Sequence, residues 1–242
     1  MYQKIFIFCL LNFIYLGSSS SVPYVTKCKA DDAACIKSSA QAMVTKFVDG
    51  IPELGVEKMD PMNLKKPIDA SSPGLKVILK DLVVTGLRDC NIQSMSRDAA
   101  KNKLFAKILC DAVNTVGQYE MDGKLIVLQV SGKGKITTVL KKILMSVEAD
   151  MGEKKGKDGK THWDIKRFTH SFELQDKSEL EFENLFTGSE VLGKAANQVI
   201  ESSSNEIILE IGPPVVKAIA TKVVENTKRF FNNVDPADLA LD

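Results

Sequence analysis

The spacing of hydrophobic positions changes twice along this chain, and each spacing predicts a different kind of element. Across 31–50, apolar residues recur every three to four positions, which predicts an amphipathic helix. Asp31 and Asp32 can cap its first turn, and Gly50 is a helix stop signal. The apolar face of this helix consists of Ile36, Ala40, Met43, Val44, Phe47, Val48 and Ile51.

Segment 75–186 instead predicts long antiparallel strands. Apolar and polar residues alternate there, most clearly in 145–151, which is the period of a sheet with one dry face. The alternation slips at 79–82 and near Arg167, and such slips predict bulges and strong curvature. Polar clusters predict three chain reversals, at 97–103, 122–123 and 152–160.

After Phe186 the spacing becomes helical again and continues to Phe230 and Phe231. Prolines at 213–214, behind Gly212, should kink this helix or divide it in two. About forty helical residues at ~1.5 Å each would reach some 60 Å, longer than a compact globule of this mass needs. We therefore expect an elongated molecule.

The first 21 residues predict a secretory signal peptide. Lys4 precedes an apolar run and a small-residue tail at 17–21, and the run is shorter than the ~20 residues that span a bilayer. An uncleaved anchor is the alternative. We expect a secreted, extracellular protein in which 22–242 form a single domain.

Charge and composition exclude some partners. Loss of Lys4, the one charged residue of the signal segment, lowers the formal net charge from +1 to zero. A neutral chain has no global attraction to nucleic acid. The chain also has no second apolar span of the kind that would indicate stable membrane insertion. With 26% charged and 44% hydrophobic residues, the chain is globular in composition, and we expect a monomer.

Four cysteines remain once Cys9 leaves with the signal peptide, and an even number in an oxidising compartment favours two disulfides out of three possible pairings. A bridge from Cys28 to Cys35 would pin the entering chain to the first helix. Cys90 and Cys110 can face each other if their segments form a hairpin that turns midway between them. Two buried thiols are the alternative.

The sequence offers little for catalysis or metal binding, so we expect neither an enzyme nor a cofactor. It has no Gly-x-Ser-x-Gly elbow, and its two histidines, His162 and His170, lack a nearby nucleophile sequence or a third metal ligand. We expect both histidines to be exposed or hydrogen-bonded. The glycines of 132–135 lack phosphate-loop spacing and should relieve a bent strand. Lysines at 154–160 can touch an anionic membrane but are more typical of a solvated loop.

Several short runs, in a characteristic order, carry a family resemblance. They are Gly-Ile-Pro-Glu-Leu at 50–54, Met-Asp-Pro at 59–61, Val-Thr-Gly-Leu at 84–87, Tyr-Glu-Met-Asp-Gly-Lys at 119–124, Gly-Lys-Gly-Lys at 132–135, Glu-Asn-Leu-Phe-Thr-Gly at 183–188 and Val-Leu-Gly at 191–193. Together with Cys28 and Cys35 ahead of the first helix, they resemble the insect Takeout and juvenile-hormone-binding family of the tubular lipid-binding superfamily. With no cysteine after Cys110, the chain is more similar to Takeout than to the hormone carriers.

The resemblance implies an elongated α+β fold: a long C-terminal helix wrapped by a highly curved antiparallel β-sheet, with an internal apolar tunnel. It implies a carrier of a small hydrophobic ligand, such as a juvenile-hormone-like terpenoid, a fatty acid or a quinone-like lipid. A surface-active lipid-transfer or pathogen-lipid-binding protein is the alternative. Candidate lining residues, each also consistent with ordinary core packing, are Met43, Phe47, Met145, Val147, Met151, Phe168, Phe172, Phe182, Phe186, Ile211, Val215 and Ile219.

Overall fold

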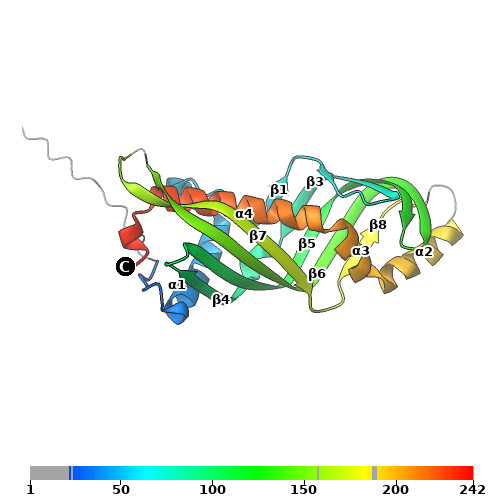
Figure 1. Ribbon diagram of the computed structural model, residues 1–242. Helices are drawn as coiled ribbons and strands as arrows, with labels where there is room; N and C mark the ends of the chain where they lie inside the picture. The colour runs from blue at the N-terminus through cyan, green and yellow to red at the C-terminus, as the bar shows by residue number, and fades with distance from the viewer. Residues whose placement is uncertain (1–21, 23, 157, 187–189, 242) are drawn as a thin grey trace, which may run out of the picture.

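The computed structural model describes residues 22, 24–156, 158–186 and 190–241. The predicted signal peptide, 1–21 with its Cys9, therefore lies outside the described residues. Figure 1 shows an elongated molecule in which a long, curled antiparallel sheet is accompanied by helices along its length, so the expected shape is confirmed.

Two very long strands form the spine of the eight-stranded sheet. β5 (Lys103–Leu125) pairs along its whole length with β6 (Leu128–Lys155). β3 and β4 pair with opposite ends of β5, while β8 and β7 pair with opposite ends of β6. The other strands are β1 (Met62–Leu64), β2 (Ile68–Asp69), β3 (Leu75–Thr85), β4 (Asn91–Asp98), β7 (Thr161–Leu174) and β8 (Glu179–Phe182).

The sheet curls without closing. β1 and β2 lie at the outer side of β3, and the described strands include no pairing between them and the opposite edge, β7 and β8. Register shifts at 80–83 of β3 and at 150–151 of β6, opposite 165–167, confirm the two bulges that the sequence predicted. Such bulges increase local bending and twist, which curls the sheet.

The sheet divides into two halves, which we name by their residues. The packed half comprises 75–85, 113–125, 128–140 and 179–182, and the hairpin half comprises 91–98, 103–110, 143–155 and 161–174. Between the two halves, the set of alternate positions that faces inward shifts by one residue. Cys110 and Val113 are both buried although they are three residues apart, whereas regular alternation would place them on opposite faces. Lys142, at this junction on β6, has a positive φ of 45°.

The first helix forms where the hydrophobic spacing predicted it. α1 (Ala33–Asp49) begins with the Asp32 carboxylate accepting a hydrogen bond from Cys35 N at 2.9 Å, and it ends at Gly50, whose φ is 92°. Gln41 ties α1 to the start of β4, since its amide oxygen accepts from Ile92 N at 2.6 Å and its amide nitrogen donates to Cys90 O. α1 therefore covers the hairpin half.

The C-terminal helical region is divided in three: α2 (Glu190–Ser202), α3 (Ser204–Ile211) and α4 (Pro213–Asn233). The break before Pro213 confirms the predicted effect of the prolines. A further break at Ser203 was not predicted. At ~1.5 Å per residue the 21 residues of α4 extend about 30 Å, so one unbroken 60 Å helix is not what spans the molecule.

A buried asparagine anchors α4 to the loop after α1. Asn226 is fully buried, and its amide accepts from Glu57 N at 3.1 Å and donates to Glu57 O at 3.3 Å. The Glu57 carboxylate also contacts Lys222 and Arg229, the latter at 2.5 Å. Because a buried amide needs its hydrogen-bond partners, and the Glu57 ion pairs add to these contacts, α4 is held against the loop.

One predicted reversal is wrong. β5 runs straight through Asp122 and Gly123 to Leu125, and the chain turns instead at Ile126 and Val127. Gly123 has a φ of 129°, and a Cβ there would lie 2.2 Å from Gly74 O, so this glycine allows close contact with the turn before β3. The predicted reversals at 97–103 and within 152–160 are confirmed, although Gly152 belongs to β6.

The glycines of 132–135 make room for another segment. A Cβ on Gly134 would lie 2.3 Å from Glu183 O, and one on Gly132 would lie 2.5 Å from Asn184 O. The chain after β8 therefore lies directly on β6. Space for that contact, in addition to any bending of the strand, accounts for both glycines.

Both disulfides favoured by the cysteine count are present. Cys28 bonds to Cys35 at the entrance to α1, and Cys90 bonds to Cys110 across the β4–β5 hairpin. The hairpin turns between Asp98 and Lys103, and this register sets the second pair opposite each other. The alternative of two buried thiols is therefore excluded.

Candidate functional site

The inner face of the hairpin half is the candidate site. Cross-strand register places Met95 of β4, Ala106 of β5, Val147 of β6 and His170 of β7 in one row across the sheet. A neighbouring row contains Ile108, Met145 and Phe172, and a third contains Leu104, Ala149 and Phe168. Four strands thus present a continuous surface that is mostly apolar.

This surface is only half-buried, although helices cover it. Of these side chains only Ala149 is buried, and the others keep part of their surface accessible. On the helices, Val44 and Phe47 of α1 and Val215, Ile219 and Val223 of α4 are likewise half-buried, and they belong to the same apolar cluster as Met145 and Phe172. Accessible apolar surface on facing walls means that these walls are not packed tightly together.

The packed half is different, because its inner face is filled. Val77 of β3, Tyr119 of β5 and Val130 of β6 are at most 1% exposed. The Tyr119 hydroxyl donates to Glu183 O at 2.7 Å, and its ring packs edge-on against Phe182 at 4.9 Å. Burial, with a smaller contribution from the charge of Glu183, raises the pKa of Tyr119 to about 12.

The candidate lining residues divide between these environments. Met145, Val147, Phe168 and Phe172 lie on the half-buried inner face, and Val215 and Ile219 face it from α4. Phe182 and Ile211 are buried in the main core, and Met43 is buried in a smaller cluster with Ile51 and Phe230. The remaining three, Phe47, Met151 and Phe186, are half-buried. Phe47 lies edge-on to Phe230, and Met151 lies opposite Ile165 beyond the bulge.

Sequence reasoning missed several residues of this surface, namely Met95, Leu104, Ala106, Ile108 and Leu174. Apolar Phe105 and Leu109, which face outward, obscure the alternation along this part of β5. The hairpin register would have found Ala106, since it lies opposite Met95 and Val147.

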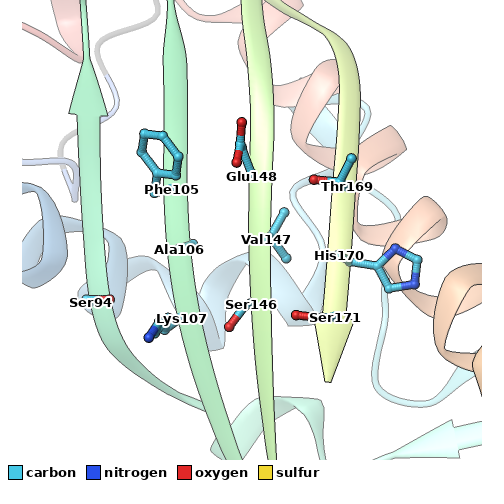
Figure 2. A pocket seen from close by; sticks show the side chains of 10 residues that line it. All are labelled: Ser94, Phe105, Ala106, Lys107, Ser146, Val147, Glu148, Thr169, His170 and Ser171. Carbon is cyan, nitrogen blue, oxygen red and sulfur yellow. The ribbon is translucent and has the colours of Figure 1, made fainter. Parts of the chain in front are cut away.

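The opposite, outer face of the hairpin half carries a shallow depression of about 390 Å³. Figure 2 shows this depression, with Phe105 and Glu148 on the side of the sheet away from the helices. Its lining is mixed: polar Ser94, Lys107, Ser146, Glu148, Thr169 and Ser171 occur together with Phe105, Ala106, Val147 and His170.

The two histidines are not brought together, because they lie eight residues apart along the extended strand β7. His162 is buried and hydrogen-bonded, as expected: Nδ1 lies 2.8 Å from Val234 O, and Nε2 lies 3.0 Å from an Asp158 carboxylate oxygen. His170 is half-buried on the inner face, with its ring 5.9 Å from that of Phe168.

The end of the inner face near the β6–β7 turn is closed by aromatic contacts. Trp163 packs edge-on against Phe231 of α4 at 5.6 Å, and the Arg97 guanidinium lies 4.9 Å from the Trp163 ring. In the basic tip, Lys160 pairs with Asp235 at 3.0 Å while remaining exposed to solvent. No helix in the described part of the chain combines the length and apolar composition needed to cross a membrane.

A curled sheet whose apolar inner face is covered by helices defines a class of binding protein for hydrophobic ligands. The model of the family described as "Haemolymph juvenile hormone binding protein (JHBP)" matches residues 5–241, and the chain belongs to this family. It is therefore a binding protein and not an enzyme.

Individual relatives agree with this assignment. The crystal structure of Epiphyas postvittana Takeout 1 superposes with a TM-score of 0.84 at 28% identity, covering 90% of this chain and all of that one. The circadian clock-controlled protein daywake of Drosophila melanogaster is 22% identical over 218 residues, 86% of this chain and 84% of its own. A putative beta-carotene-binding protein of Schistocerca gregaria is 20% identical over 200 residues, 82% of this chain and 80% of its own.

Proposed function

We propose that this protein is a secreted, monomeric carrier that holds one elongated apolar molecule between the hairpin half of its sheet and the helices α1 and α4. The observation that supports this is the half-buried apolar surface on both facing walls, including Met145 and Phe172 of the sheet and Ile219 of α4. Apolar side chains that remain accessible beneath a helical cover are stabilised when a ligand removes them from water.

The ligand class follows from the chemistry of these walls. They are built mainly from Val, Ile, Leu, Met and Phe, so affinity comes from removing apolar ligand surface from water, at about 0.8 kcal/mol per methylene. A terpenoid, a long-chain fatty acid, a quinone-like lipid or a carotenoid would each supply enough surface after association costs. The flexible thioethers of Met95 and Met145 can adapt to ligands of different shape.

Secretion is proposed on separate grounds. The N-terminal segment 1–21 has the composition of a cleavable signal peptide, and two disulfides are typical of proteins that fold in an oxidising compartment. The remaining residues, 22–242, then act as one binding domain.

Neighbouring positions on β6 provide a matched test. Met145→Trp adds volume on the inner face, whereas Ser146→Trp adds the same side chain on the outer face. Binding of a fluorescent long-chain fatty acid should weaken about tenfold or more in Met145→Trp and change less than about twofold in Ser146→Trp. Urea unfolding verifies that both variants are folded. Equal binding by the two variants, or a wild-type protein that leaves the probe exposed to water, would refute the carrier.

A further inference from the structure

The tip of the β6–β7 hairpin extends beyond the rest of the sheet. β5 begins at Lys103, which pairs with Asp150, so the strand segments 151–155 and 161–165 pair only with each other. An isolated two-stranded hairpin is at best marginally stable in water. The position of this tip therefore depends on what it contacts outside the sheet (Figure 1).

The tip contacts the C-terminal end of α4 and the segment that follows it, and the Arg97 guanidinium of β4 also lies against its Trp163 ring. His162 bonds to the Val234 carbonyl, and Lys160 pairs with Asp235 at 3.0 Å. These polar contacts flank the Trp163 ring, which packs on Phe231. Asp164 adds a further ion pair, 3.6 Å from Lys228 of α4.

His162 is the unusual member of this group, because both of its ring nitrogens face hydrogen-bond acceptors. Nδ1 faces Val234 O at 2.8 Å, and Nε2 faces both carboxylate oxygens of Asp158 at 3.0 and 3.1 Å. A neutral imidazole carries one N–H and one lone pair, so only the cation can donate to both partners. The ring is 3% exposed, and water therefore has little access to repair a mismatched contact.

Among the described residues, the other charged groups near His162 are carboxylates and lysine ammonium groups, types that ordinarily titrate outside the range of an imidazole. Burial alone would lower the pKa of His162, but the hydrogen bonds with Val234 O and Asp158 outweigh burial and raise it. Carboxylates and ammonium groups keep their charge between about pH 6 and about pH 9. The charged groups of this region come from four parts of the chain. They are Lys154, Asp158, Lys160, Asp164 and Lys166 of the hairpin, Asp235 and Asp238 of the C-terminal segment, Lys228 of α4 and Lys27 of the N-terminal segment.

We propose that the hairpin tip, residues 151–156 and 158–165, is a pH-sensitive latch over the end of α4, fastened by the His162 cation and loosened when that cation loses its proton. Loss of the proton leaves a ring lone pair facing either Val234 O or the Asp158 carboxylate, which breaks one of the two contacts. Since the folded-state pKa is raised, the contribution is complete below about pH 6.5 and is lost as pH rises through the folded-state pKa.

Hydrogen exchange tests the latch without any ligand. With intrinsic rates corrected, protection of peptides covering 151–165 should fall about fivefold or more between about pH 6 and about pH 8.5, while peptides from β3 stay unchanged. His162→Gln should show low protection at both pH values. His170→Gln, which changes the one other histidine, should behave as the wild type does.

A second variant fixes the sign of the effect. Asp158→Asn removes the carboxylate that stabilises the cation, so the loss of protection should move to lower pH. A pH response that persists in His162→Gln, or a midpoint in Asp158→Asn that does not move, would overturn the latch.

A role in ligand exchange also rests on the proposed carrier function. If the carrier function holds, a bound fluorescent fatty acid should dissociate faster at about pH 8.5 than at about pH 6, and His162→Gln should remove this difference. The two ideas fail separately. A protein that shows the exchange response but binds no probe refutes the carrier, whereas one that binds the probe without an exchange response refutes the latch.

Discussion

The packed half and the hairpin half are built on the same two strands, β5 and β6, yet they treat their inner faces in opposite ways. In the packed half, alternate residues of three strands are buried, with Val77 and Val130 completely covered. In the hairpin half the equivalent rows, such as Ile108, Met145 and Phe172, stay half-buried. One continuous sheet can therefore supply a conventional core at one end and a half-buried apolar surface at the other.

Local close approach accounts for the packed half. There the glycines Gly132 and Gly134 let the backbone of 183–185 lie directly on β6, and Gly117 lets Leu82 approach β5. In the hairpin half the helices α1 and α4 cover the sheet, and Phe47 of α1 and Phe172 of β7 stay half-buried within the same apolar cluster. The two halves therefore differ in what approaches their inner faces: mainly backbone in the packed half, and helix side chains in the hairpin half.

The largest expected effect is a difference in the cost of deleting inner-face side chains. Leu79→Ala in the packed half should lower the free energy of unfolding by about 3 kcal/mol, because it leaves a cavity in a filled core. Met145→Ala in the hairpin half should cost about 1 kcal/mol, since its side chain already borders accessible space. Urea unfolding of both variants measures the difference, and equal costs would mean that the two halves are packed alike.

The disulfide at the junction should matter next. Replacing both Cys90 and Cys110 by Ala opens a loop with a separation of 20 residues and should cost about 3 kcal/mol. The same change at Cys28 and Cys35, separated by 7, should cost about 2.5 kcal/mol. In the variant that lacks the Cys90–Cys110 disulfide, amide protection measured by hydrogen exchange should fall more in β4 than in β3. An equal fall in both strands would contradict the role of this disulfide at the junction.

At alkaline pH, the difference in stability between the wild type and Tyr119→Phe should report on the packed half. Tyrosine ionises near pH 10 in an unfolded chain, whereas burial raises the pKa of Tyr119 to about 12. Its contribution is intact below about pH 10 and falls by about 2 kcal/mol as pH rises toward 12. Relative to Tyr119→Phe, wild-type stability should therefore decline across this range, and parallel curves in urea unfolding would show that the phenol is not buried.

Much of the fold could be predicted because the relevant signals are local. Alternation gave the strands, capping gave the start of α1 at Asp32, and Pro213 marked a real helix boundary. The reversal expected at Gly123 was wrong because the glycine serves a contact with Gly74, in the turn before β3, which is distant in the sequence. No pattern along one strand reveals such a contact.

The site was harder to predict than the fold, because accessible space is a property of facing walls. Met145 and Phe172 were identified since period-two alternation assigns them to the inner face. Phe182 has the same alternation but is buried against Tyr119. Sequence periodicity separates inside from outside, whereas the fit between opposing elements decides which inner residues remain accessible.

The amide of Asn226 has a mechanical consequence for α4. By exchanging two hydrogen bonds with the single residue Glu57, it resists sliding of α4 along its axis and rolling about it. Under the proposed carrier function, α4 is then the rigid wall, and ligands of different width are accommodated by movement of the strands on the other side.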